Sequence, residues 1–278
     1  YFELLTPRIE YALLNFHRIS GFSAEPSHYC FVMTPSVVAI LISSLLGRPC
    51  LSLLKSVIIV ASYILTFSSV GLFMIAITLS VLMLRRSSVA SFALKAVLAA
   101  GLVGAIITIP QINTRIVDTY EVFAISDSED VNISSLTLYK NFLVTMESAF
   151  DQPFFGAGLG GHETNYYKYL PDSMLALGPN LNEKDANSML LRLVSEFGIP
   201  FTIIFYLIVL RLWTGLPSPR DSIPVFWKKL TSSALLGLII ANSLRSGNYI
   251  NHGFPFFLVL YFSVRNSLIF GDVRLSYP

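Results

Sequence analysis

The feature that most constrains this chain is a long polar segment, residues 111–198, which stands between two strongly apolar runs. The run before it ends at Ile109 and Pro110, and the next one begins after Gly198. Of the 17 carboxylates in the chain, 12 lie in this segment, accompanied by only five lysines or arginines. Polar groups left unpaired in hydrocarbon cost several kcal/mol each, so we expect the segment to lie outside the lipid.

Composition indicates that lipid is the solvent for much of the remaining chain. Charged residues make up 13% of the sequence and hydrophobic residues 54%, with a mean hydropathy of +0.64. An ordinary soluble domain carries about 25% charged residues, which cover its surface. This chain has too few charges for that. No nucleic-acid partner is expected.

The apolar runs predict an all-α fold, a polytopic integral membrane helical bundle with a large, partly helical external loop. Residues 1–278 are interpreted as a single membrane domain. Because the sequence opens at Tyr1 without methionine or a signal-peptide pattern, we expect it to be the C-terminal portion of a longer protein. The predicted spans are about 28–46, 51–67, 70–84, 91–109, 199–213, 230–244 and 254–270.

The second and third spans are shorter than the roughly 20 residues that a full crossing prefers. A polar break, Thr66 to Ser69, separates them, so they form either a pair of short helices or one long kinked run. We favour the pair, because only seven spans place the flanking basic residues on one side, the cytoplasm. These basic residues are Arg48, Lys55, Arg85, Arg86, Lys95, Arg211, Arg220, Lys228 and Lys229.

The polar segment has its own internal pattern. Residues 127–135 are acidic and small, as in a flexible tip, and 136–150 carry Leu138, Phe142, Met146 and Phe150 at the spacing of an amphipathic helix. Residues 151–161 form a turn with enough glycine for close backbone approach. Residues 185–197 are again helical and are expected to run straight into the fifth span.

Four short stretches together resemble the O-antigen ligase and polymerase superfamily of bacterial inner membranes. They are RISGFSAEPS (18–27), LTFSS (65–69), DQPFFGAGLG (151–160) and ANSMLLRLVSEFGIP (186–200). Each motif is short, and the resemblance rests on their order and spacing around the large loop. One departure is Ser69, where an arginine is usual in that superfamily.

The resemblance implies a metal-independent glycosyltransferase without a cofactor, multi-pass in the bacterial inner membrane, with its large loop periplasmic. Its substrate would be undecaprenyl-pyrophosphate-linked oligosaccharide, polymerised into O-antigen, capsule or exopolysaccharide. Membrane lipid, a chain-length regulator and a flippase are the partners it implies. The alternative is an O-antigen ligase that transfers glycan to lipid A core. Ligases usually carry a His-Asn pair where this chain reads Asp185-Ala186-Asn187-Ser188, and this difference favours the polymerase.

A non-enzymatic alternative is a polysaccharide transporter. Transporters carry ionisable residues within their spans. The predicted span interiors hold almost none, and the polar residues gather at one face, which favours chemistry at the membrane surface.

Two residues near the first span are the predicted catalytic pair. Arg18 would hold the pyrophosphate, because a planar guanidinium binds phosphate oxygens in pairs and stays charged. Glu25 would orient Arg18 or act on the acceptor hydroxyl. The alternative is that Arg18 contacts lipid headgroups and Glu25 caps the first helix.

Further candidates for binding pyrophosphate or glycan come from the later part of the chain. Arg245 ends a span on the external side, where it meets either a phosphate or lipid headgroups. Arg192 faces the site or pairs with Glu196 four residues on, and the pair is the simpler interpretation. The remaining candidates are Arg115, Gly156, Gly158 and His162, the last being either a base or an idle surface residue.

Replacement of Arg18 by alanine tests the predicted pair. The Arg18→Ala variant is expected to insert into the membrane but to lose chain elongation, because the leaving pyrophosphate would lack its counter-charge. Polymer length on a gel measures this. Normal polymer in this variant removes Arg18 from the site. In the fold, Arg18, Arg245 and the 156–161 turn should converge on one cavity open to lipid.

Overall fold

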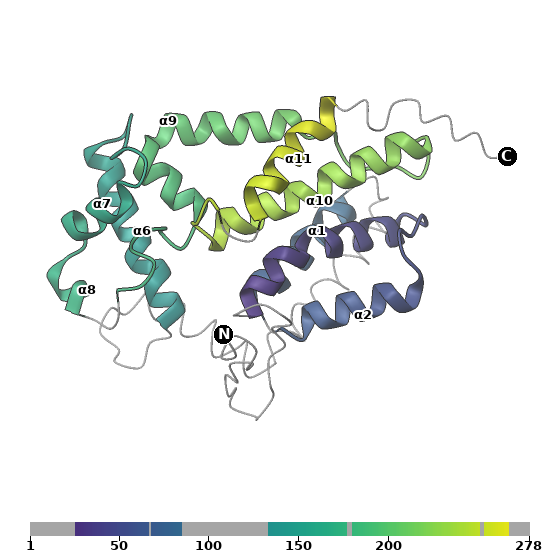
Figure 1. Ribbon diagram of the computed structural model, residues 1–278, viewed down its shortest axis with the longest axis horizontal. Helices are drawn as coiled ribbons and strands as arrows, with labels where there is room; N and C mark the ends of the chain where they lie inside the picture. Colours follow the sequence, from purple (N-terminus) through teal and green to yellow (C-terminus); the bar gives the residue numbers. More distant parts are fainter. Residues whose placement is uncertain (1–25, 67, 85–132, 177–179, 251–252, 267–278) are drawn as a thin grey trace. The chain divides into compact units, whose positions relative to one another are not determined.

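The computed structural model describes residues 26–66, 68–84, 133–176, 180–250 and 253–266, and all regular structure in these ranges is α-helical (Figure 1). The expectation of an all-α chain is therefore confirmed for the described residues. The chain forms two compact units. Unit 1 comprises Tyr1–Ile106, Arg211–Ala241 and His252–Pro278, and unit 2 comprises Ile107–Leu210 and Asn242–Asn251.

Three described helices are long and apolar enough to cross a membrane: α1 (Pro26–Leu45), α9 (Met189–Leu212) and α10 (Ile223–Arg245). Two more, α2 (Leu53–Ile64) and α11 (Phe254–Asn266), are apolar but shorter. These helices support membrane association. The other described helices are α3 (Ser69–Leu84), α6 (Ile133–Asp151), α7 (His162–Tyr169) and α8 (Asp172–Ala176). The predicted span 91–109 lies outside the described residues.

In unit 1, α1 contacts both α2 and α3, which are two separate helices as expected rather than one kinked run. Thr66 explains why α2 stops. Its hydroxyl donates to the Tyr63 carbonyl at 2.7 Å and accepts from the Ser68 backbone N–H at 3.2 Å. A side chain that satisfies backbone groups in this way competes with continuation of the helix. Both cysteines, Cys30 and Cys50, are free.

Helix α10 begins seven residues earlier than the predicted span 230–244. Pro224, which the predicted span left outside the helix, occupies its first turn. Proline is tolerated there because an N–H in the first turn has no intrahelical acceptor. The extended helix packs against α1, where Val38 and Ile42 meet Phe226 and Leu230.

Basic residues that the sequence placed on one side of the membrane gather at one end of unit 1. Arg48 donates to the Asp221 carbonyl at 2.8 Å, and Lys229 pairs with the Asp221 carboxylate at 3.1 Å. The neighbouring Lys228 donates to the Arg265 carbonyl, and Arg265 in turn donates to the Arg211 carbonyl. This grouping agrees with the expected alternation of spans; which side of the membrane it faces stays a prediction.

Unit 2 has a small apolar core in which Val144 of α6 packs with Tyr166 and Leu170 at α7. Helix α6 is confirmed, although it begins at Ile133, within the segment interpreted as a flexible tip. Its buried face is largely polar and includes Thr137, Lys140, Asn141, Thr145 and Ser148. Its apolar residues Phe142, Met146 and Phe150 are exposed instead.

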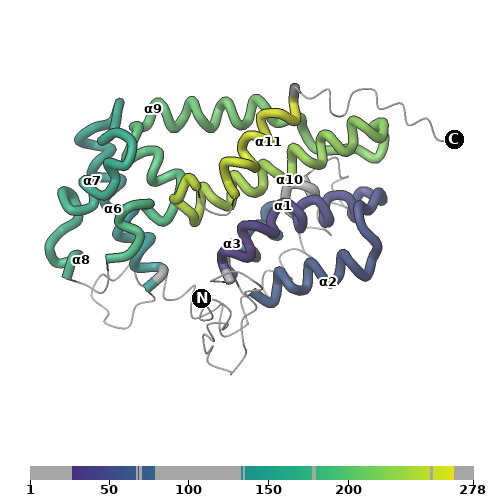
Figure 2. The backbone as a smooth tube through the Cα atoms, in the orientation of Figure 1, coloured from purple at the N-terminus to yellow at the C-terminus, as the bar shows by residue number. Residues whose placement is uncertain are grey.

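Helix α9 is broken at Gly198, whose backbone has φ 81° and ψ 172°, and its path bends there (Figure 2). The expectation that residues 185–197 run straight into the fifth span is therefore wrong. Two residues explain the break. Gly198 adopts the left-handed region that other residues avoid, and Pro200 has no N–H to donate to the Glu196 carbonyl.

The glycine-rich turn after α6 provides hydrogen-bond partners for the backbone groups at this break. Ala157 N–H donates to the Ser195 carbonyl at 3.0 Å, and Gly158 N–H donates to the Glu196 carbonyl at 2.7 Å. The Ile199 N–H, freed from its helical acceptor, donates to the Pro153 carbonyl at 2.9 Å. All three backbone groups released by the break are thus paired, as buried backbone polar groups require.

Two glycines of this turn provide a matched test. Both have positive φ, but a Cβ on Gly156 would lie 2.6 Å from the Ser195 oxygen, whereas one on Gly158 meets nothing within 4 Å. Gly158→Ala should cost about 1 kcal/mol of strain and Gly156→Ala about 3 kcal/mol or more. Thermal unfolding in detergent measures the difference. Equal losses in the two variants would mean that the turn does not press on α9 as described.

Candidate functional site

Unit 2 contains an open cavity of about 510 Å³. Three segments line it: the stretch before α9, the first turn of α9 and the stretch after α10. Its lining combines amides, two carboxylates, two cations and one aromatic ring, with few apolar side chains. The lining residues are Asn180, Leu181, Asn182, Glu183, Lys184, Asp185, Arg192, Asn248, Tyr249 and Ile250.

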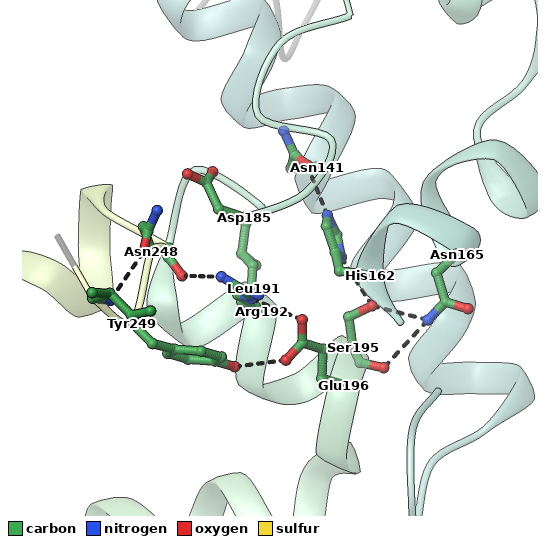
Figure 3. A network of polar contacts seen from close by, with 12 residues as sticks. Asn141, His162, Asn165, Asp185, Leu191, Arg192, Ser195, Glu196, Asn248 and Tyr249 are labelled. Atoms are coloured by element: carbon green, nitrogen blue, oxygen red, sulfur yellow. Dashed lines mark hydrogen bonds and ion pairs between the residues drawn. The ribbon is translucent and has the colours of Figure 1, made fainter. Parts of the chain in front are cut away.

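Arg192 is held in place on one side of its guanidinium (Figure 3). Its Nε donates to Glu196 at 2.8 Å, and its Nη1 donates to the Gly247 carbonyl at 3.0 Å. The predicted pairing of Arg192 with Glu196 is confirmed. Among the described residues, no protein acceptor meets Nη2, so its two N–H groups remain for a ligand at the cavity.

Tyr249 and Glu196 complete the support of this arginine. The guanidinium carbon lies 4.1 Å from the centre of the Tyr249 ring, a cation–π contact. The Tyr249 hydroxyl donates to the second Glu196 oxygen at 3.0 Å, so the fully buried carboxylate has a partner on each oxygen. Burial, and then the neighbouring Glu196, raises the pKa of Tyr249, which keeps the phenol protonated as a donor.

The segment before α9 is tightly constrained. Ala186 and Asn187 have φ of 57° and 53°, a conformation that costs non-glycine residues about 1 kcal/mol or more. A Cβ on Gly247 would lie 1.3 Å from the Asp185 carbonyl oxygen, so only glycine fits where the two walls of the cavity meet. Ser188 then starts α9, accepting from the Leu191 N–H at 3.3 Å and donating to the Ser243 carbonyl.

The surroundings of Asp185 in the cavity shift the pKa of its carboxyl group. One oxygen accepts from the Asn187 N–H at 3.0 Å, and the other has no hydrogen-bond donor among the described residues. Burial raises the pKa of Asp185 above its ordinary value, while the Asn187 N–H and Arg192 act in the opposite direction. A carboxylate with a raised pKa is a stronger base, which suits proton transfer near neutral pH.

Lys140 and Tyr166 fix the wall of the cavity at Asn180. The Lys140 ammonium donates to Asn180 Oδ1 at 3.0 Å, and the Tyr166 hydroxyl donates to the same oxygen at 3.3 Å. Both side chains are fully buried. Burial lowers the pKa of Lys140, and it raises that of Tyr166 to about 12 with smaller contributions from Glu183 and Tyr167.

His162 lies inside unit 2 and not at its surface, which corrects its interpretation as a surface residue. Asn141 donates to the Thr137 carbonyl, so its Oδ1 faces His162 Nε2 at 2.9 Å and accepts from it. His162 Nδ1 then accepts from the Ser195 hydroxyl at 3.0 Å. The ring therefore has a protein partner at each nitrogen and positions α6 and α7 against α9.

Of the predicted site residues that the structure describes, the cavity includes one, Arg192. Arg245, Gly156, Gly158 and His162 do not line it, so the expected convergence of Arg245 and the 156–161 turn on one cavity is not what the described residues show. The two glycines serve the docking of the turn on α9. Arg18, Glu25 and Arg115 lie outside the described residues.

The sequence analysis missed Asp185, Tyr249 and Asn248 as site residues. Asp185 stands at the start of a predicted helix, and Asn248 and Tyr249 stand between the last two predicted spans. The Asn, Asp and Gly content of these two stretches was the available signal. The missing information was that two stretches about 60 residues apart form one cavity.

No protein-family model, curated protein or solved structure matches the chain. Inferences about its function therefore depend on the cavity, on the helices and on the short motifs.

The burial of His162 predicts a pH effect on stability. Burial, and then Arg192, lowers the pKa of His162 from 6.5 to about 4, so the fold favours the neutral ring. The stability that the neutral ring of His162 gives the fold is fully present above about pH 6.5 and is lost as the pH falls toward 4. Between pH 6.5 and 5 the loss should reach up to about 2 kcal/mol.

Thermal unfolding of the wild-type protein and of the His162→Gln variant is measured at several pH values. Because the two proteins share all other histidines, the difference in their stability reports on His162. The stability difference between the two proteins should shrink as the pH falls. A difference that does not change with pH would contradict a buried, neutral His162.

Proposed function

We propose that the chain is a membrane glycosyltransferase that polymerises lipid-pyrophosphate-linked oligosaccharide repeat units into a surface polysaccharide. The observation that carries this proposal is the cavity lined by both Asp185 and Arg192, of which Arg192 keeps two unpaired N–H groups. Such a lining suits a polar, partly anionic ligand. The short motifs that resemble the O-antigen ligase and polymerase superfamily favour the same class.

The position of the cavity along the chain suits a substrate anchored in lipid. Arg192 and Glu196 stand in the part of α9 before the break, and the apolar segment of α9 follows directly after it. A ligand at Arg192 would therefore lie near the level at which the chain enters the membrane. We propose that this cavity lies on the periplasmic side of a bacterial inner membrane.

The proposed reaction assigns a role to each of the two groups. An acceptor hydroxyl forms a bond to the anomeric carbon of the donor, and the bond between that carbon and the phosphate oxygen breaks. The lipid pyrophosphate leaves with the electron pair, its charge balanced by Arg192. Asp185 takes the proton of the acceptor hydroxyl, a role that the sequence suggested for Glu25.

The test is an elongation assay with the full chain reconstituted in lipid and supplied with a lipid-linked repeat unit. Asp185→Asn preserves the acceptor for the Asn187 N–H but removes the base, so turnover should fall about 100-fold or more with little change in KM. The wild-type rate should also decline as the pH falls through the raised pKa of Asp185. Asp172→Asn, an exposed carboxylate on α8 outside the cavity, is the matched control.

Normal elongation by Asp185→Asn would remove this carboxylate from the reaction. Transfer to lipid A core without elongation would identify a ligase instead of a polymerase. Neither product from the wild-type chain, with the substrate supplied and the fold intact, would overturn the proposed activity.

A further inference from the structure

Helix α6 presents three large apolar residues outward, although Leu136 and Val144 are buried. Its buried face carries Thr137, Asn141 and Thr145, which bond to carbonyls four residues earlier or to His162. Phe142, Met146 and Phe150 are 37%, 40% and 76% exposed. In a helix that packs on a protein core in water, the apolar stripe faces the core. The arrangement in α6 is the reverse.

The exposed apolar surface continues into the turn that follows α6. Phe154, Phe155 and Leu159 are 67%, 87% and 75% exposed. Side chains of this size rarely stay in water as a contiguous group unless they form an interaction surface. We refer to Phe142, Met146, Phe150, Phe154, Phe155 and Leu159 as the apolar strip.

The backbone of the turn fixes where the strip lies relative to α9. Pro153, Ala157 and Gly158 are hydrogen-bonded to residues 195–199, the point at which the apolar segment of α9 starts. From Ile199 onward α9 exposes apolar side chains, among them Phe201, Ile203 and Ile204. These residues belong to helix α9, Met189–Leu212, which as a whole is long and apolar enough to cross a membrane. The strip is thus joined to the end of a lipid-facing surface.

We propose that the apolar strip inserts into the bilayer interface, with lipid acyl chains and not another protein as its partner. The charged residues nearby in the sequence fit the headgroup layer: Glu147 is exposed on α6, and Asp151 pairs with Lys168 at 3.0 Å on the surface. Such a combination of large apolar side chains with a polar rim is typical of segments that lie in the interface.

Insertion of the apolar strip would fix the position of the cavity relative to the headgroup layer of the membrane. Gly158, within the inserted turn, donates to the Glu196 carbonyl, and the Glu196 carboxylate holds Arg192. The strip therefore ties the guanidinium to a fixed depth near the headgroups. This inference concerns the membrane contact and does not depend on the proposed enzymatic activity.

Spin labelling of the full chain in lipid nanodiscs tests the proposal. In a Cys30→Ser, Cys50→Ser background, a nitroxide is attached at Met146→Cys or Phe155→Cys. Its collision rate with oxygen, which partitions into lipid, is compared with that of a water-soluble nickel chelate. Leu181→Cys is the matched control, since Leu181 is an exposed apolar residue of the same unit outside the strip, at the cavity.

The proposal predicts that oxygen collisions exceed nickel collisions severalfold at both strip positions, with the reverse at Leu181. Labels at Met146 and Phe155 that behave like the Leu181 label would place the strip in water and overturn the proposal. Labels protected from both reagents would mean that a protein surface, such as a second copy, covers the strip, and this would overturn it equally.

Discussion

The hydrogen bonds between the glycine-rich turn and the broken helix α9 are the interaction on which unit 2 depends. A helix interrupted by Gly198 and Pro200 leaves two carbonyls and one N–H without partners, and the turn supplies partners for all three. Without this pairing, each unsatisfied group would cost about 1–3 kcal/mol when buried. The break also separates α9 into a part that lines the cavity and a part that is suited to lipid.

The same pairing of buried polar groups explains how unit 2 can bury so many of them. His162, Ser195, Asn141 and Asn165 form a continuous set in which each side chain meets a protein partner (Figure 3). A satisfied network of this kind specifies one arrangement of helices, because a shifted helix would leave several groups unpaired at once. The apolar side chains that an aqueous domain would place here lie on the outside of α6 instead.

Much of the helical framework could be predicted from the sequence, because runs of apolar residues and breaks such as Thr66–Ser69 are local signals. The predicted start of α10 was too late, because the residues from Ile223 to Lys229 are less apolar than the span and include Pro224, which fits a first turn. The direction of the apolar face of α6 could not be predicted, since periodicity marks a stripe without saying whether core or lipid covers it.

The candidate site was harder to predict than the helices. Arg192 and its pairing with Glu196 follow from a spacing of four residues on one helix, which is again local. The opposite wall, with Tyr249 and Gly247, is brought to Arg192 by folding across about 55 residues, and no short-range pattern encodes that approach. Arginines chosen for their charge alone, such as Arg245, could not be distinguished from those that line the cavity.

The close fit of Gly247 against Asp185 has a consequence for how such a chain can diversify. Gly247 packs against Asp185 and accepts a hydrogen bond from Arg192, which also pairs with Glu196. Substituting one of these residues therefore disturbs the others. Leu181, Lys184 and Ile250 line the same cavity but are exposed at its edge. Descendants of this sequence are therefore free to vary that edge, and with it the ligand that the cavity prefers, while inheriting an unchanged centre.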